Sequence, residues 1–375
     1  MRILSTTIIL PSGDSHWIRI GAIADALRRQ GVEVDLVHYV MKGSRTHEMY
    51  RREQDSWRDD EQVHLVSGPQ ALLRHLRQVR GGTYDLVYGN NLAGTFIGVS
   101  RIWEKTPLIF DMHGVPEESL LQVPLRRSVY LHYSLMKLIE RINIRIADRI
   151  VCVSQSMIEY LHTVKRVSRE KMVYATNGVN LDEFAPPTSC AGERVREALG
   201  IDDMRVFGYI GAFQGWQGVP ALIAAARALR TENVAVLLVG DGGGSREGNV
   251  ISLPRVPRDR VAEYYAACDV LVLPRPRHLA TEVAAPTKFA EYCAMGKPVL
   301  TTNVGDAAHL VRTYGNGVVV NDATPGDLLE GIARFSEMGE SKLRHMGLNS
   351  RILAEKEFDW EKIGIQLAQE LQECV

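Results

Sequence analysis

The stretch PTKFAEYCAMGKPVLTTNV, residues 286–304, joins a helix, a turn and an apolar strand, an order that is typical of the ligand-binding edge of a parallel sheet. Pro286 suits a helix start, where the N–H groups of Thr287 and Lys288 point outward and the Lys288 ammonium adds positive charge. Glu291 follows one turn later, at a spacing suited to two adjacent ribose hydroxyls. We therefore expect a phosphate and ribose site; the alternative is an ordinary Lys–Glu pair on a solvated face.

Short apolar runs alternate with helical patterns on both sides of this stretch, which indicates βαβ units and parallel sheets. The turn-rich segment TNGVNLDEFAPPTS, residues 176–189, interrupts the alternation and predicts a hinge between two Rossmann-like α/β halves. The polar residues 42–61 predict a surface excursion. The expected strands are Arg2–Leu10, Glu33–Tyr39, Leu86–Tyr88, Leu108–Asp111, Arg149–Ser154, Val206–Ile210, Val234–Val239, Val250–Leu253, Val270–Leu273, Val299–Thr302 and Gly317–Val320.

Length and composition set the remaining bounds. A chain of 375 residues suits two domains, and its 45 % hydrophobic and 24 % charged residues exclude disordered and collagen-like classes. The formal net charge of −1 argues against general binding to nucleic acid. Five scattered cysteines without a CxxC pair predict reduced thiols. The opening apolar run ends at Pro11, too early for a signal peptide, and no window suits a membrane span, so we expect a cytoplasmic protein.

Other strand-to-helix junctions carry residues suited to a ligand. After the first strand, Gly13 allows close backbone approach and His16 begins a helix, although a plain tight turn is an equal alternative. In IFDMHGVPEES, residues 109–119, a histidine beside a carboxylate, His113 beside Asp111, can hydrogen-bond a sugar hydroxyl or take up a proton. The alternative there is a solvent-facing loop histidine. Two glycine-rich junctions, YIGAFQGWQGV and LLVGDGGG, follow strands of the second half.

Motifs over almost the whole length resemble the GT-B fold, and within it the family-4 retaining glycosyltransferases. The motifs that carry the resemblance are DMHGVPEE, ADRIVCVSQSM, NGVNLDEF, YIGAFQGWQGV, LLVGDG, YYAACDVLVLP, PTKFAEYCAMGKPVL and FDWEKI. The resemblance implies two Rossmann-like parallel-sheet domains facing across a cleft. Residues 1–170 plus 360–375 would bind the acceptor, with the C-terminal helix crossing back to this domain. Residues 171–359 would bind a nucleotide sugar.

The implied reaction moves a sugar, with retention, from a UDP- or GDP-type donor to a glycan, a lipid-linked or a small-molecule acceptor. It needs no nicotinamide and usually no metal, and the chain has no Asp-x-Asp motif beside a phosphate loop. His113 would lie near the anomeric carbon, with Asp111 and Glu282 as further catalytic candidates and Gly13 and His16 in an acceptor-side loop. The donor-binding candidates are Thr287, Lys288, Glu291, Gly211, Gln214, Gln217, Arg255 and Val256.

Two departures from the family pattern leave alternatives open. Glu282 precedes Glu291 by nine positions instead of eight, so that Val283 occupies the expected place. An Arg and Lys pair that the family uses after the first strand of the second domain is replaced by glutamines, so the diphosphate must be met by Lys288, by Arg275 or Arg277, or by backbone N–H groups. The missing pair leaves a catalytically inactive, partner-binding homologue as an alternative. A non-hydrolysing nucleotide-sugar epimerase, which has the same two-domain fold, is a second alternative.

Residues 124–149, PLRRSVYLHYSLMKLIERINIRIADR, predict a basic amphipathic helix. Such a helix suits peripheral contact with an anionic membrane. The alternative is a core helix with a solvated basic face, for which Ile139, Ile142 and Ile146 would be the packing positions. The basic residues on which the choice depends are Arg126, Arg127, Lys137, Arg141 and Arg145.

Overall fold

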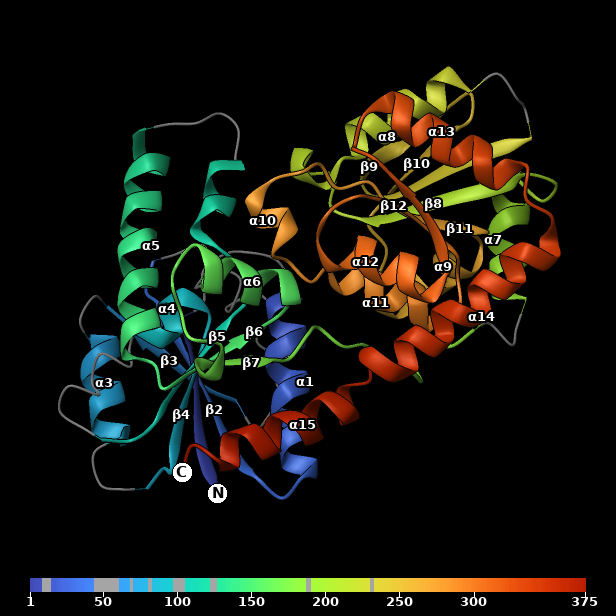
Figure 1. Ribbon diagram of the computed structural model, residues 1–375. Helices are drawn as coiled ribbons and strands as arrows, with labels where there is room; N and C mark the ends of the chain where they lie inside the picture. The colour runs from blue at the N-terminus through green and yellow to red at the C-terminus, as the bar shows by residue number, and fades with distance from the viewer. Residues whose placement is uncertain are drawn as a thin grey trace. The chain divides into compact units, whose positions relative to one another are not determined.

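The chain forms two compact units, which are shown in Figure 1. The computed structural model describes residues 1–8, 15–43, 61–67, 70–79, 83–96, 105–121, 127–186, 190–229 and 233–375, without the side chains of residues 15, 16, 61 and 71. Unit 1 comprises Met1–Thr176 and Trp360–Val375, and unit 2 comprises Asn177–Asp359. Each unit is built on its own parallel sheet, so the expected α/β class with two Rossmann-like domains is confirmed.

Unit 1 contains a seven-stranded sheet in the order β3-β2-β1-β4-β5-β6-β7. Its strands are β1 Arg2–Ile8, β2 Glu33–Met41, β3 Glu61–Val66, β4 Leu86–Asn90, β5 Leu108–Met112, β6 Arg149–Cys152 and β7 Met172–Tyr174. Its helices are α1 Ser15–Arg29, α3 Gln70–Val79, α4 Asn91–Phe96, α5 Arg127–Ile146, α6 Gln155–Thr163 and α15 Trp360–Gln372, with the short turns η3 Pro116–Leu121 and η4 Arg169–Lys171.

Helix α15 returns to unit 1 and completes its core. Trp360, Leu367 and Leu371 of α15 are buried in one cluster with residues of α1 and of the sheet. The helices come so close that a Cβ on Gly364 would lie 2.4 Å from the Cβ of Ala26. The C-terminal helix thus crosses back to the first domain as expected, because its apolar face is covered there.

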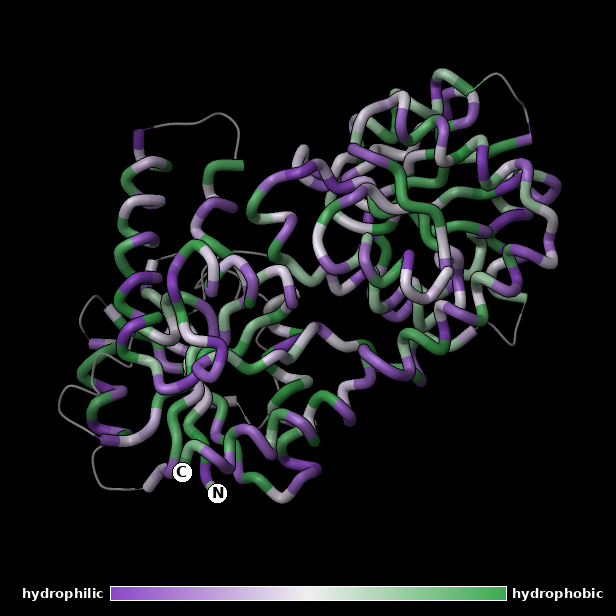
Figure 2. Tube along the Cα trace, in the orientation of Figure 1, coloured by the Kyte–Doolittle hydropathy of each residue, from purple (hydrophilic) through white to green (hydrophobic). Residues whose placement is uncertain are grey.

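Unit 2 contains a six-stranded sheet in the order β10-β9-β8-β11-β12-β13. Its strands are β8 Arg205–Gly211, β9 Val234–Glu247, β10 Val250–Pro254, β11 Val270–Leu273, β12 Val299–Thr302 and β13 Gly317–Val320. Its helices are α7 Ala191–Leu199, α8 Val219–Ala228, α9 Val261–Ala266, α10 Leu279–Glu282, α11 Thr287–Ala294, α12 Gly305–Tyr314, α13 Pro325–Ser336 and α14 Glu340–Glu357, with the short turns η5 Gly215–Gln217 and η6 Arg258–Arg260. Figure 2 shows that the strands of both sheets are largely apolar, as strands covered on both faces are.

Every expected strand is present, and the differences are at the ends or in short strands. β6 stops at Cys152 because the Ser154 side chain accepts from the N–H of Met157 and caps α6. β3 and β7 were not predicted, and β7 pairs with β6, so that unit 1 extends to Thr176 instead of residue 170. Most of the expected excursion, residues 44–60, lies outside the described residues.

In the part of the chain that the structure describes, no helix combines the length and the apolar character that a membrane crossing requires.

Candidate functional site

The strand order of unit 2 reverses between β8 and β11, and in open parallel sheets ligands commonly bind beyond the carboxyl ends of the strands at such a reversal. Gly211 ends β8, and Pro274 directly follows β11. The η5 turn that leaves β8 passes so close to β11 that a Cβ on Gly218, which has a φ of +78°, would lie 1.5 Å from the carbonyl oxygen of Pro274. Only glycine permits this approach, which holds the loops after β8 and β11 together.

Lys288, in the first turn of α11, reaches the end of β8. Its Nζ donates to the hydroxyl of Tyr209 at 2.9 Å and lies 4.5 Å from the centre of that ring. A Cβ on Gly211 would lie 2.7 Å from the same Nζ, so the glycine makes room for the ammonium. Two of the predicted donor-binding residues, Gly211 and Lys288, are therefore neighbours. Pro286 is the N-cap of α11, one position earlier than expected, and helical backbone begins at Thr287.

A second cation, Arg275, lies near enough to Lys288 for its charge to act on the ammonium. Its guanidinium lies 5.2 Å from the centre of the Trp216 ring in η5, and the residue is only 5 % exposed. Burial of the ammonium and the charge of Arg275 lower the pKa of Lys288 to about 7. Two positive charges that repel one another in this way are suited to a multivalent anion, because an anion between them offsets the repulsion.

Glu291 is buried and does not form the solvated pair with Lys288 that was the alternative. Its Oε2 accepts from the hydroxyl of Tyr265 at 2.7 Å, and its Oε1 lies 3.3 Å from Nη1 of Arg258. Arg258 also contacts Glu183 at 3.3 Å and covers the ring of Phe184. Tyr265 and Arg258 were missed by sequence reasoning: Tyr265 lies in the motif YYAACDVLVLP but no role was assigned to it, and Arg258 lies outside the motifs. The carboxylate is fixed in place by groups from two other elements.

Glu282 has a structural partner. Its Oε2 accepts from the N–H of Gly305, the first residue of α12, at 2.8 Å, and its Oε1 lies 3.5 Å from Nε of Arg277. Arg277 also donates to the carbonyl oxygen of Asn303 at 3.0 Å. These contacts hold Glu282 and Arg277 at the start of α12, and both side chains keep an exposed portion.

The remaining donor-side candidates lie on the loops after β8 and β10. Arg255 follows β10 and donates to Asp241 at 2.8 Å, while the other oxygen of Asp241 accepts from the N–H of Phe213. The N–H of Phe213 and the charge of Arg255 hold the pKa of Asp241 below its usual value. This carboxylate ties the two loops together. Val256 packs partly against the core, while Gln214 is the N-cap of the η5 turn and Gln217 is its last residue.

In unit 1, His113 directly follows β5 and its side chain is only 5 % exposed. Its Nε2 lies 3.1 Å from Oδ2 of Asp111, the next-to-last residue of β5, and Tyr88 donates to the same oxygen at 2.9 Å. The solvent-facing loop histidine that was the alternative is therefore wrong. The ring is placed by a buried carboxylate, which is the arrangement expected for a histidine that binds or polarises a ligand.

Arg19 of α1 holds Asp111 from the other side. Its Nε and Nη2 donate to the two oxygens of Asp111 at 3.1 Å and 2.8 Å, and both residues are fully buried. The guanidinium also donates to the carbonyl oxygens of Ala175 and Thr176. Burial alone would raise the pKa of Asp111, but the charges of Arg19 and His113 hold it well below its usual value. The carboxylate stays ionised and fixed, so its negative charge always faces His113.

Two candidates fall at the edge of what the structure describes. Gly13 lies outside the described residues, and His16 is described only as a backbone position in the first turn of α1. Within the described ranges, no cluster of His, Cys, Asp and Glu side chains has the arrangement of a metal site.

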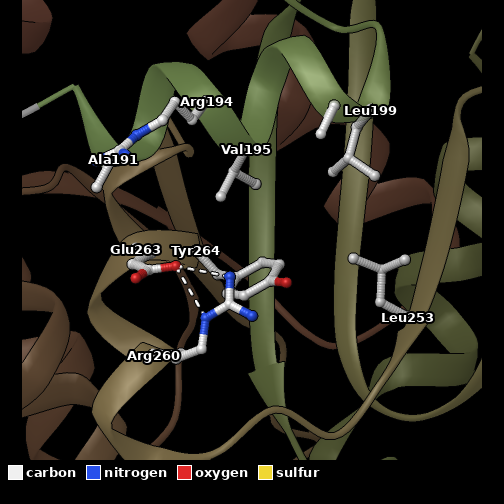
Figure 3. Close-up of a pocket in the computed structure, with 9 residues that line it drawn as sticks. Ala191, Arg194, Val195, Leu199, Leu253, Arg260, Glu263 and Tyr264 are labelled. Atoms are coloured by element: carbon white, nitrogen blue, oxygen red, sulfur yellow. Dashed lines mark hydrogen bonds and ion pairs between the residues drawn. The ribbon is translucent and has the colours of Figure 1, made fainter.

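A groove of about 300 Å³ lies elsewhere in unit 2, between α7 and α9 (Figure 3). Arg260 and Glu263 form an ion pair at 2.9 Å across its floor. Tyr264 lines this groove, whereas the next residue, Tyr265, donates to Glu291. The groove contains none of the predicted donor-binding residues. The other lining residues are Ala191, Arg194, Val195, Ala198, Leu199 and Leu253.

Comparison with sequence families assigns both units. Residues 204–337 match the family described as "Glycosyl transferases group 1", and residues 18–183 match "Glycosyltransferase Family 4". The D-inositol 3-phosphate glycosyltransferase of Acidothermus cellulolyticus is 25 % identical over 335 residues, which cover 81 % of this chain and 70 % of the relative. The enzyme of the same name from Thermobispora bispora is 23 % identical over 343 residues, covering 83 % of this chain and 76 % of the relative.

Solved structures of similar fold cover the whole chain. Anabaena HepE, crystallised with UDP and glucose, has a TM-score of 0.74 at 18 % identity and covers 99 % of both chains. A glycosyltransferase from Rickettsia africae has the same TM-score and identity, covering 100 % of this chain and 98 % of that one. At this identity the likeness concerns the fold.

Proposed function

The chain is a GT-B glycosyltransferase of the family-4 type, and from this premise we propose that it transfers a sugar, with retention of configuration, from a UDP- or GDP-type nucleotide sugar. Unit 2 binds the donor and unit 1 contributes the acceptor side. We propose that the reaction needs no metal, because basic side chains of the protein would balance the charge of the diphosphate. The acceptor is a glycan, a lipid-linked sugar or a small polyol; the named activity of the relatives makes an inositol phosphate the first acceptor to test.

The observation that supports the proposal best is the pair of cations at the reversal of strand order in unit 2. Lys288 and Arg275 lie beyond β8 and β11, where the helix start at Thr287 adds outward N–H groups. This pair supplies the charge that the glutamines after β8 lack. Glu291 lies one turn along α11, and its fixed carboxylate suits the two hydroxyls of a ribose. UDP bound to Anabaena HepE, of the same fold, makes UDP the first nucleotide to test.

In unit 1 the candidate for the reacting sugar is His113. It hydrogen-bonds a sugar hydroxyl or the oxygen that leaves or attacks, and Asp111 keeps its ring in one orientation. Asp111 itself is engaged by Arg19 and Tyr88, so it is not free to attack carbon. Glu282 is engaged by the N–H of Gly305. With both carboxylates occupied, we infer that departure and attack take place on the same face of the sugar, without a glycosyl-enzyme intermediate.

The test combines a binding screen with product analysis. UDP, GDP and ADP, each with and without a sugar, are titrated by calorimetry, and the best donor is then incubated with candidate acceptors, including inositol phosphate. NMR of the product must show the anomeric configuration of the donor. Inverted product contradicts retention.

The same experiment separates the alternatives. Without acceptor, an epimerase changes the stereochemistry of the nucleotide sugar, whereas a transferase leaves it unchanged or slowly hydrolyses it. A protein that binds no nucleoside diphosphate at millimolar concentration is an inactive homologue, and the whole proposal then fails.

A further inference from the structure

Helix α5 of unit 1 exposes a continuous apolar stripe. Leu131, Leu135 and Leu138 are 74 %, 51 % and 55 % exposed, and Tyr130 beside them is 52 % exposed. Their spacing of three and four residues places the leucines on one face. The opposite face packs on the unit, where Glu140 and Asn143 are buried, and Ile139 is buried at the edge of the stripe. Figure 2 shows apolar and hydrophilic residues alternating along α5.

Three arginines share this exposed face. Arg127 lies four positions before Leu131, Arg141 lies three after Leu138, and Arg145 follows one turn later; all three are exposed. At an interface between water and an apolar phase, arginines can lay their stems along the apolar surface while the guanidinium groups reach the polar side.

The acidic groups of this region are turned away and neutralised. Glu140 is the sole acidic residue in the sequence of α5 and is fully buried, where it binds Lys137 and Lys165. Glu117 of η3 binds Lys137 at 2.9 Å. The exposed face of α5 therefore carries positive charge and apolar surface, with no carboxylate of the helix itself to offset them.

We propose that this face, Arg127, Tyr130, Leu131, Leu135, Leu138, Arg141 and Arg145, docks unit 1 on an anionic lipid bilayer. The leucines enter the boundary between headgroups and acyl chains, and the arginines bind lipid phosphates. A second copy of the chain would bind this face less favourably than a bilayer does. Arginines stand at both ends of the stripe, so two stripes packed antiparallel would place Arg127 of one copy against Arg141 and Arg145 of the other. This inference does not depend on the transfer reaction.

The lipid face is joined to the His113 segment. The η3 turn follows His113 within three residues, and the contact between Lys137 and Glu117 fastens η3 to α5. If α5 lies on a bilayer, the segment from His113 to η3 is therefore held at a constant distance from the lipid. An acceptor carried by lipid would be presented to the loop at a constant depth.

The test is co-sedimentation of the full chain with vesicles of phosphatidylcholine alone and of phosphatidylcholine containing roughly 30 % phosphatidylglycerol. We expect binding to the anionic vesicles and weak binding to the neutral ones, with the partition coefficient falling as salt is raised. Replacing Arg127, Arg141 and Arg145 by Gln should lower the partition coefficient by about 100-fold, since each basic residue near an anionic surface contributes about fivefold. Leu131→Ser, Leu135→Ser and Leu138→Ser together should lower it by at least about tenfold.

The matched control is Leu348→Ser with Ile352→Ser on α14 of unit 2, which are 60 % and 49 % exposed. It removes exposed apolar surface of the same kind, at two positions outside α5, and should leave vesicle binding unchanged. Circular dichroism verifies that each variant is folded. Three results overturn the proposal: equal binding to neutral and anionic vesicles, wild-type binding by the triple leucine variant, and a wild-type dimer that the leucine variant turns into a monomer while neither binds vesicles.

Discussion

The ammonium of Lys288 lies 2.9 Å from the hydroxyl of Tyr209 and within 4.5 Å of the centre of its ring, at the end of β8. The negative charge of Glu291 favours the ammonium, but burial and the positive charge of Arg275 outweigh it and lower the pKa of Lys288. Burial and the charge of Arg275 therefore make the charged form of Lys288 unfavourable in the free protein, and a bound anion would relieve this repulsion.

The unfavourable charge on Lys288 makes nucleotide binding dependent on pH. The pKa of Lys288 is lowered to about 7, so the charged fraction in the free protein falls as pH rises through about 7. A diphosphate favours the ammonium and raises its pKa on binding. The dissociation constant for UDP should therefore rise on the order of tenfold between about pH 7 and pH 8.5. Calorimetry over this range measures it. Lys288→Arg, which keeps its charge, should abolish the dependence, and a dependence that persists in this variant would assign it to another group.

Glu291→Ala should raise the dissociation constant for UDP by roughly 10- to 100-fold, because a hydrogen bond to a charged group contributes about 1.5–3 kcal/mol. Tyr265→Phe should have a smaller effect in the same direction, since it frees one carboxylate oxygen from its donor. Glu330→Ala, on the exposed face of α13, is the control. An unchanged affinity of folded Glu291→Ala for UDP would remove Glu291 from the site.

Gly211→Ala should reproduce much of the effect of losing Lys288. The added Cβ would lie 2.7 Å from Nζ, and the φ of +145° disfavours any side chain. We expect weaker binding of UDP with little change for uridine, because only the diphosphate needs the ammonium. Gly243→Ala is the matched control, since a Cβ there meets nothing within 4 Å. Equal losses for UDP and uridine would indicate a disturbed fold instead.

His113→Ala should lower kcat by about 10²- to 10⁴-fold, the range of a positioned polar catalytic group. Affinity for UDP should change little, because the nucleotide-binding candidates all belong to unit 2. Initial rates with the best donor and acceptor, together with calorimetry, separate the two effects. Near wild-type turnover in the folded variant would refute the role of His113.

Arg19→Met should destabilise unit 1 by about 3–5 kcal/mol, because it leaves the carboxylate of Asp111 buried without its main counter-charge. Hydrogen exchange followed by mass spectrometry should show faster exchange in β5 and β6, while peptides of unit 2 serve as the internal control. Combining Arg19→Met with Asp111→Asn should restore part of the protection, since no unpaired charge then remains buried. Unchanged exchange in β5 of the single variant would show that the pair is dispensable.

The sequence predicted the strands well where apolar residues run without interruption, as in Val270–Leu273. It missed β3 and β7 for different reasons. β3 mixes polar and apolar residues after a polar segment, and β7 has only three residues. Neither therefore shows the alternation or the apolar run by which a strand is recognised in a sequence. β9 was expected to end at Val239, but continues through glycines to Glu247 because Ser245 and Arg246 pair with β10. Pairing across the sheet outweighs the low strand propensity of glycine.

For the site, the motif residues Lys288 and Glu291 were predictable, whereas their partners were not. Tyr265 and Arg258 approach Glu291 from other elements, and a single sequence does not reveal such tertiary contacts. Arg19 was missed because an arginine in an amphipathic helix is normally exposed. Its burial depends on Asp111, which lies 92 positions later in the chain.

The return of α15 to unit 1 reverses the usual order of folding on the ribosome. Domains commonly fold from the N-terminus as they emerge. Here the cluster that buries Ile20, Ile23 and Leu27 also needs Trp360, Ile363 and Leu367, so unit 1 cannot complete its core until these residues have been synthesised. Unit 2 is continuous from Asn177 to Asp359 and needs nothing beyond it. In the nascent chain, unit 2 is therefore complete while unit 1 still exposes an apolar face of α1. This face is then the segment of unit 1 most available to aggregation and to chaperones.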